Sequence, residues 1–95
     1  MAYFVVNRFH GASWVDGQPR DRQAGWPEHR DFMNALPDGF VILGGPVGDD
    51  RRAMFIVRAA DPRDVRRILD LDPWVRSGHL VDVVEPLEIV LGNPS

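Results

Sequence analysis

The 95-residue chain lacks cysteine and lysine altogether, and each absence removes a class of chemistry. Without cysteine there is no disulfide, no thiolate nucleophile and no sulfur ligand for a metal ion. Without lysine there is neither a Schiff-base amine nor a lysine general base. All 11 cationic side chains are therefore arginines, whose planar guanidinium groups suit carboxylate partners.

The chain also lacks a basic balance of charge and any long apolar run. Its formal net charge of -3 and its pI of about 5.4 argue against binding to nucleic acid, because phosphates attract basic surfaces. No segment reaches the length of a membrane span, and the first residues do not form a targeting signal. In the absence of both signals, a cytoplasmic protein is expected. With 44% hydrophobic and 26% charged residues, the composition predicts one globular domain over residues 1–95.

Four segments have the composition of β-strands, namely 3–9, 40–43, 52–59 and 79–91. Residues 40–43 are a continuous apolar run, which predicts a buried strand that leaves the sheet at the GGP motif of 44–46. This strand is predicted to form a hairpin with 52–59. Pro86 within the last segment predicts an edge position, a bulge or a bend. Residues 10–25 are polar and glycine-containing, which predicts a long loop of the kind that is mobile or functional in compact domains.

A first helix is predicted at 27–36, because proline favours the first helical position and a Pro-Asp-Gly turn follows. Its apolar stripe consists of Phe32, Met33 and Leu36. His29 lies three residues before Phe32 and therefore shares this face. The imidazole is expected to point toward the core rather than into solvent.

A second helix is predicted to begin after Asp61, which suits the N-cap, with Pro62 at the first helical position. Its apolar stripe consists of Val65, Ile68 and Leu69. The next position on that face is Asp72, so a carboxylate lies where a core residue would otherwise be expected.

The predicted order β-α-β-β-α-β is that of the split ferredoxin-like fold, an α+β architecture in which both helices cover one face of a four-stranded sheet. The other face still carries apolar side chains, because the first and last strands are apolar on both sides. Two sheets stacked in a homodimer would bury that face, so we expect a homodimer.

Three motifs extend along this order of elements: EHRDF at 28–32, GGP at 44–46 and DPWVRSG at 72–78. In these motifs the chain resembles the YCII-related proteins, which are small dimeric α+β barrels. The resemblance implies an enzyme whose active pair is a histidine and an aspartate, here His29 and Asp72. Related barrels include muconolactone isomerase-like and cofactor-free oxygenase-like enzymes, so the fold alone does not select a reaction.

An imidazole beside a carboxylate suits general acid–base chemistry. Asp72 would fix the orientation of the His29 ring and stabilise its protonated form, and a well-placed base contributes roughly 10²–10⁴ in rate. Such a pair fits proton abstraction next to a carbonyl, elimination or isomerisation. The structural alternatives are an interior His29 with satisfied hydrogen bonds, and Asp72 as a helix cap before Pro73.

Five further residues are candidates for binding a substrate. The backbone N–H groups of Gly44 and Gly45, before Pro46, would face a developing oxyanion, although glycines before a proline are also ordinary turn residues. Arg8 would receive an anionic group through both arms of its guanidinium. Trp74 would line the pocket or belong to the core.

The remaining polar residues predict neither a metal ion nor a cofactor. His10 and His79 have no ligand spacing to each other or to His29, and Ser13 and Ser77 lack the surroundings of a nucleophile. Two hypotheses follow. The chain is a small cofactor-independent lyase or isomerase that acts on a small organic molecule, or it is a non-catalytic dimeric module that binds a small ligand or a protein.

Overall fold

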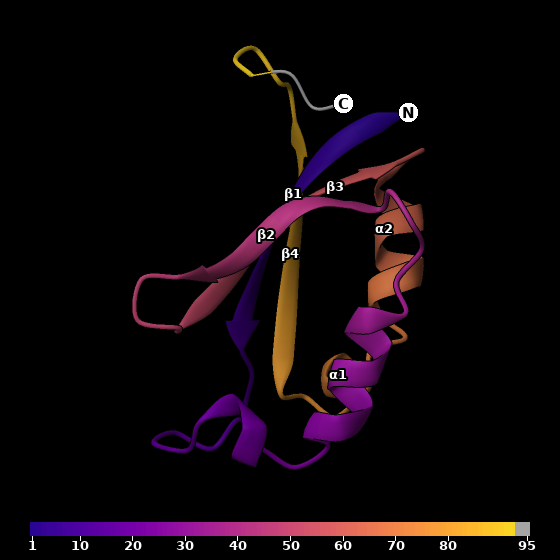
Figure 1. The fold of residues 1–95 in the computed structure, drawn as a ribbon. Helices are drawn as coiled ribbons and strands as arrows, with labels where there is room; N and C mark the ends of the chain where they lie inside the picture. The colour runs from indigo at the N-terminus through magenta and orange to yellow at the C-terminus, as the bar shows by residue number, and fades with distance from the viewer. Residues whose placement is uncertain (93–95) are drawn as a thin grey trace.

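The computed structural model describes residues 1–92, which form a four-stranded antiparallel sheet with the helices on one face (Figure 1). The strands are β1 (Ala2–His10), β2 (Val41–Val47), β3 (Arg52–Ala59) and β4 (Leu80–Leu87). The helices are α1 (Trp26–Asn34), α2 (Pro62–Leu69), the one-turn α3 (Pro73–Arg76) and a 3-10 turn, η1 (Arg20–Arg22). The sheet order is β2-β3-β1-β4, so the predicted ferredoxin-like α+β fold is confirmed.

The last strand is shorter than predicted. β4 pairs only with β1 and is therefore an edge strand, a position that tolerates Pro86. It ends at Leu87 instead of residue 91, because Leu87 pairs with Tyr3 and β1 itself begins at Ala2. Almost no strand is left for residues 88–91 to pair with.

The second strand differs most from the prediction. β2 does not end at the GGP motif of 44–46 but continues through it to Val47, paired with β3 in the predicted hairpin. It is an edge strand with a bulge between Val41 and Leu43, and Leu43 is 56% exposed. The apolar run is therefore not a buried strand. The edge position also accommodates Pro46, which has no backbone N–H to donate.

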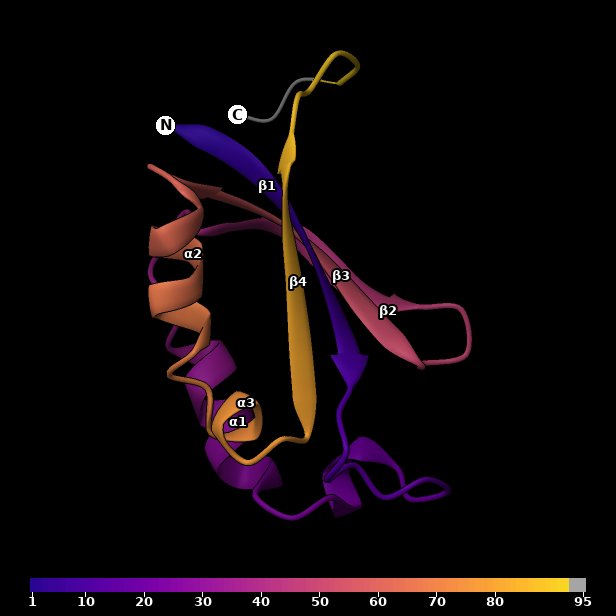
Figure 2. The same ribbon diagram turned by 180° about the vertical axis from the view of Figure 1, so that it is seen from behind.

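The hydrophobic core lies between the sheet and α2, beside the end of the sheet where β1 begins (Figure 2). Its buried members are Phe4, Val6, Phe40, Val57, Ala59, Val65 and Leu69. Asp61 caps α2 as predicted, because its side chain accepts a hydrogen bond from the backbone N–H of Asp64 at 2.9 Å. The cap and the apolar stripe together dock α2 on this half of the sheet.

The first helix stands off the sheet. α1 begins one residue earlier and ends two residues earlier than the predicted helix 27–36, and it packs mainly against α3 and η1. His29 is its only buried residue and points inward as predicted. Phe32 and Met33, expected in the core, are only half-buried. The space that a closely packed helix would fill is a cavity.

The long loop before α1 is ordered by one buried side chain. Gln23 accepts a hydrogen bond from the N–H of Val15 and donates to the carbonyl oxygens of Val15 and Gln18, at distances of 2.8 to 3.0 Å. Gly25 then adopts a positive φ of 80°, which turns the chain into α1. These hydrogen bonds tie together the loop predicted at 10–25, and Trp14 and Arg20 from this loop line the cavity.

The sheet face opposite the helices is apolar and uncovered. Phe9, Val81 and Val83 are 40%, 52% and 39% exposed on it, and the paired Val5 and Ile56 lie half-buried beside them. This is the face that the predicted homodimer would bury. No helix within residues 1–92 has the length and apolar character needed to cross a membrane.

Candidate active site

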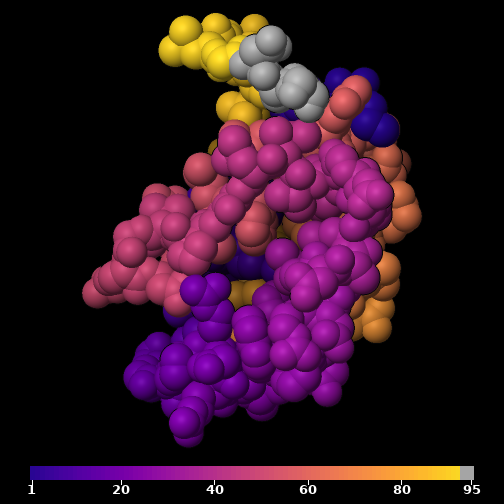
Figure 3. Space-filling model, in the orientation of Figure 1, coloured from indigo at the N-terminus to yellow at the C-terminus, as the bar shows by residue number. Residues whose placement is uncertain are grey.

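A cavity of about 280 Å³ lies between α1, the loop before it and the sheet. Figure 3 shows the hollow, with β1 at its base. One continuous face of α1 forms a wall, with Trp26, His29, Arg30, Met33 and Asn34 spaced three and four residues apart. The volume is close to the lower end of small-molecule pockets, about 300 Å³. The cavity therefore suits a molecule about the size of one substituted ring.

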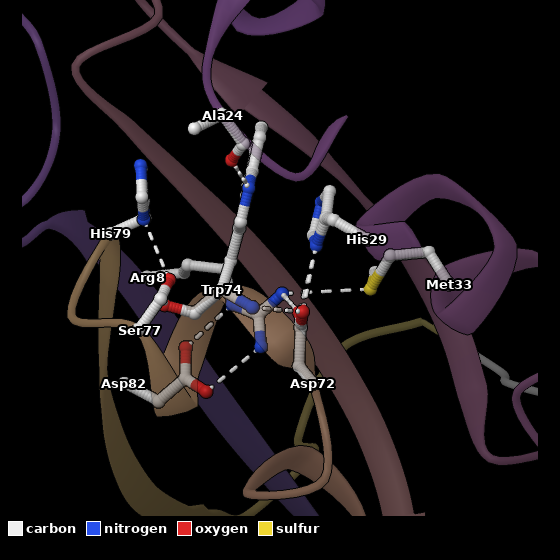
Figure 4. A network of polar contacts seen from close by, with 9 residues as sticks. All are labelled: Arg8, Ala24, His29, Met33, Asp72, Trp74, Ser77, His79 and Asp82. Carbon is white, nitrogen blue, oxygen red and sulfur yellow. Dashed lines mark hydrogen bonds and ion pairs between the residues drawn. The ribbon is translucent and has the colours of Figure 1, made fainter. Parts of the chain in front are cut away.

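Two titratable side chains meet at this cavity. Nδ1 of His29 lies 2.9 Å from both carboxylate oxygens of Asp72 (Figure 4). Asp72 is fully buried and His29 is 9% exposed. Within residues 1–92, Nδ1 is the ring nitrogen that is hydrogen-bonded, and every buried side-chain nitrogen or oxygen has a partner. Nε2 is therefore open to the cavity that His29 lines.

Asp72 is held by donors from three different elements. Besides His29, it accepts hydrogen bonds from the backbone N–H of Trp74 and from Nη1 of Arg8, both at 2.9 Å. Burial by itself raises the pKa of Asp72, but the hydrogen bonds from His29 and Trp74 and the charge of Arg8 outweigh it and lower the pKa below its ordinary value. The carboxylate is ionised at neutral pH, and it caps α3 while it orients the imidazole.

Arg8 holds two carboxylates at once. Asp82 lies directly opposite Arg8 in the β1–β4 register and takes both arms of its guanidinium, at 2.6 and 2.9 Å. Burial lowers the pKa of Arg8, but Asp82 and Asp72 together raise it above its ordinary value. Arg8 was expected to receive an anionic group of the substrate. The structure instead uses its paired arms internally, and its third bond holds Asp72.

The buried cluster beside His29 carries unequal numbers of positive and negative charges. Arg8 supplies one positive charge and Asp72 and Asp82 supply two negative charges, so with a neutral imidazole the cluster has a formal charge of -1. An ionised carboxylate beside an imidazole is the arrangement that stabilises the positive charge formed on the ring during a proton transfer.

Trp74 packs against His29 and against the other aromatic rings around the site. Its ring stacks on His29, with 4.0 Å between ring centroids and 9° between planes, and its Nε1 donates to the carbonyl oxygen of Ala24 at 2.8 Å. Trp14 meets Trp74 edge-on at 5.3 Å, and His10 stacks on Trp14 at 3.9 Å. Trp74 is only 2% exposed, so it supports the cavity wall and also belongs to the interior.

The GGP motif contributes two residues to the cavity and not three. Gly45 and Pro46 line it, whereas Gly44 does not. The absence of a side chain at Gly44 has a packing cause, because a Cβ there would collide with the ring of Phe55 and lie 2.8 Å from the carbonyl oxygen of Met54. The oxyanion role of these glycines stays a prediction.

A histidine–hydroxyl pair, His79 and Ser77, lies outside the cavity lining. Ser77 Oγ is 2.6 Å from Nδ1 of His79, and His79 stacks on Trp74, on the side of that ring away from His29 (Figure 4). Ser13 donates a hydrogen bond to the carbonyl oxygen of Ser77 at 2.7 Å. In the part of the chain that the structure describes, no three His, Cys, Asp or Glu side chains are grouped as a metal site.

Asp82 and His10 were not identified from the sequence as parts of the site. Asp82 lies on the same face of β4 as Leu80 and Val84, because the three residues are spaced two apart. It therefore occupies a position where a core residue is expected. His10 lies two residues after Arg8 on the same face of β1. Polar residues at core positions of two paired strands were the available signal for both.

A comparison with solved structures supports the fold. No protein-family model matches the chain, and no curated protein matches its sequence. Among solved structures, 5-chloro-2-hydroxyhydroquinone dehydrochlorinase from Burkholderia phenoliruptrix AC1100, in complex with 2,5-dihydroxybenzoquinone, is similar. The TM-score is 0.67 at 20% sequence identity, and the similarity covers 90% of this chain and 93% of the dehydrochlorinase. At this identity the likeness establishes a shared fold.

Proposed function

We propose that this protein is an enzyme that transfers a proton on a small organic molecule and thereby causes an elimination or an isomerisation. The observation that carries the proposal is the imidazole of His29, whose Nε2 faces a cavity while its Nδ1 is bonded to a buried carboxylate. A dehydrochlorinase with the same fold performs an elimination, which supports this class of reaction. The resemblance to YCII-related proteins points to the same pair of residues.

In the proposed reaction, Nε2 of His29 removes a proton from a carbon next to a carbonyl group. The electrons of the broken C–H bond form a new double bond, and a leaving group departs with its own bonding electrons. In an isomerisation, the proton returns to a different carbon. Asp72 keeps the other ring nitrogen protonated, and Arg8 keeps Asp72 in place. Each step uses side chains of this chain, so the proposal includes no cofactor.

The proposed enzyme is a homodimer joined through the open sheet face. Phe9 and Val81 are register partners on that face and both are exposed, as is the nearby Val83. Burying them against a second sheet would contribute about 25 cal/mol for each Å² of apolar surface removed from water. The cavity lies on the opposite side of the sheet and stays accessible in such a dimer.

The test measures the turnover of chlorinated hydroquinones and β-halogenated carbonyl compounds. Turnover is monitored by chloride release and by deuterium uptake from heavy water in NMR spectra. His29→Gln should reduce turnover by roughly 10²–10⁴. The matched control is His79→Gln, the same substitution outside the cavity lining, which should retain turnover. Equal turnover in the wild type and His29→Gln would refute the proposal. Binding of such compounds without any turnover would favour a non-catalytic module.

A further inference from the structure

The cavity and the whole chain carry charges of opposite sign. The chain has a formal net charge of -3. Apart from Arg8, which belongs to the buried cluster, the charged residues that line the cavity are Arg20, Arg30, Arg52 and one acid, Asp50. With neutral histidines this lining has a formal charge of +2. A positive hollow in an acidic protein attracts small anions and repels cations.

Two of these arginines are available to a ligand. Arg20 lies 3.8 Å from Asp50, and Arg30 lies 3.4 Å from Asp31, with at least half of each side chain exposed. Exposed pairs of this kind contribute about 0–1 kcal/mol, so the anionic group of a ligand can replace them. Arg52 is less available to a ligand, because its Nη1 already donates a hydrogen bond to Oδ1 of Asn7 at 2.8 Å.

The walls of the cavity are flat and aromatic. Trp14, Trp26 and Phe55 line it together with the imidazoles of His10 and His29. The Trp14 and His10 planes differ by only 8°. Aromatic faces prefer to pack against another planar group, and the volume of about 280 Å³ holds one ring and its substituents.

We propose that the ligand of this cavity is a small planar organic anion, such as a ring or a conjugated chain with a carboxylate, held by Arg20 and Arg30. The inference rests on the proposed function and names its substrate class. Proton abstraction next to a carbonyl places further negative charge on the carbonyl oxygen. Arginines at the same cavity would stabilise that charge as well as bind the ground state.

The experiment is calorimetric titration with three probes of equal size and different charge: benzoate, benzamide and benzylamine. Benzoate should bind most tightly, with an affinity that decreases as salt is added. Arg20→Gln and Arg30→Gln should each weaken benzoate binding about two- to fivefold and leave benzamide binding unchanged. The matched control is Arg63→Gln, on the exposed surface of α2, which should change neither.

An opposite substitution sharpens the test. Asp50 is the acid of the cavity lining and has a positive φ of 69°, a conformation that asparagine also adopts readily. Asp50→Asn should therefore keep the turn and strengthen benzoate binding. Equal binding of benzamide or benzylamine, or an equal loss in Arg63→Gln, would overturn the charge inference and leave the proposed catalytic pair intact. Binding of none of the three probes would count against the proposed ligand cavity itself.

Discussion

Replacing Asp72 with asparagine removes one negative charge from the buried cluster while keeping the shape of the side chain. The two oxygens of Asp72 accept from three donors, on His29, Arg8 and Trp74. Asparagine offers one acceptor oxygen and an NH2 group, so at least one donor would face another donor. Breaking a buried ion pair by removing one partner costs about 3–5 kcal/mol. We expect the free energy of unfolding of Asp72→Asn at pH 7 to fall by that amount.

Loss of the helix cap does not account for this cost, because asparagine caps helices as well as aspartate does. Asp61→Asn is the matched control. Asp61 caps α2 through the same kind of bond, at 2.9 Å, but it is exposed and makes no buried ion pair. Its substitution should change the free energy of unfolding by less than about 0.5 kcal/mol.

The cost at Asp72 should also depend on pH. The folded pKa of Asp72 lies below its ordinary value of 3.8, so its ionised form stabilises the fold above that value. This contribution is lost as the pH falls through the lower, folded pKa. The difference between the wild type and Asp72→Asn should therefore shrink once the pH falls below about 4.

Urea unfolding followed by tryptophan fluorescence measures each of these quantities, since the chain has 3 tryptophans. Unfolding curves at pH 7, 5 and 3 would give the free energies for the wild type and both variants. An equal cost for Asp72→Asn and Asp61→Asn, or a difference that is as large at pH 3 as at pH 5, would refute the argument that Asp72 is an ionised, buried partner.

Three further outcomes are expected. His29→Gln should leave the circular dichroism spectrum unchanged while turnover is lost, because the substitution removes the base and not a core residue. Gly44→Ala should cost about 1–3 kcal/mol in thermal unfolding, since its Cβ would overpack against β3; Gly45→Ala, whose Cβ would meet nothing within 4 Å, should leave the Tm nearly unchanged. Val83→Asp should yield the mass of a monomer in sedimentation velocity, where the wild type yields that of a dimer.

Elements with strong local signals could be predicted from the sequence. The Asp61-Pro62 start and the apolar spacing of α2 depend only on neighbouring residues, and both are confirmed. The ends of β2 and β4 depend on the strand alongside, which the local sequence does not contain. β4 ends where its pairing with β1 reaches the first residues of β1. β2 continues through Pro46 because β2 is an edge strand.

In the candidate site, too, some features follow from the local sequence and others depend on residues far away along the chain. Helical periodicity placed His29 and Asp72 on inward faces, and the structure brings their side chains together. The partners of Arg8 follow from the register between β1 and β4, which sets Asp82 directly opposite. That register is a long-range property, so the sequence suggested an arginine free for a substrate where the structure has one that is already bonded.

The gap beneath α1 has a consequence for how firmly that helix is held. α1 leans on α3 and η1, and the sheet offers it little apolar support, so its backbone amides should exchange with heavy water sooner than those of β1 and β3. The element that carries the imidazole is thus only weakly restrained by the interior. An occupant of the void would supply the packing that the chain itself leaves out, and the helix would tighten as the void fills.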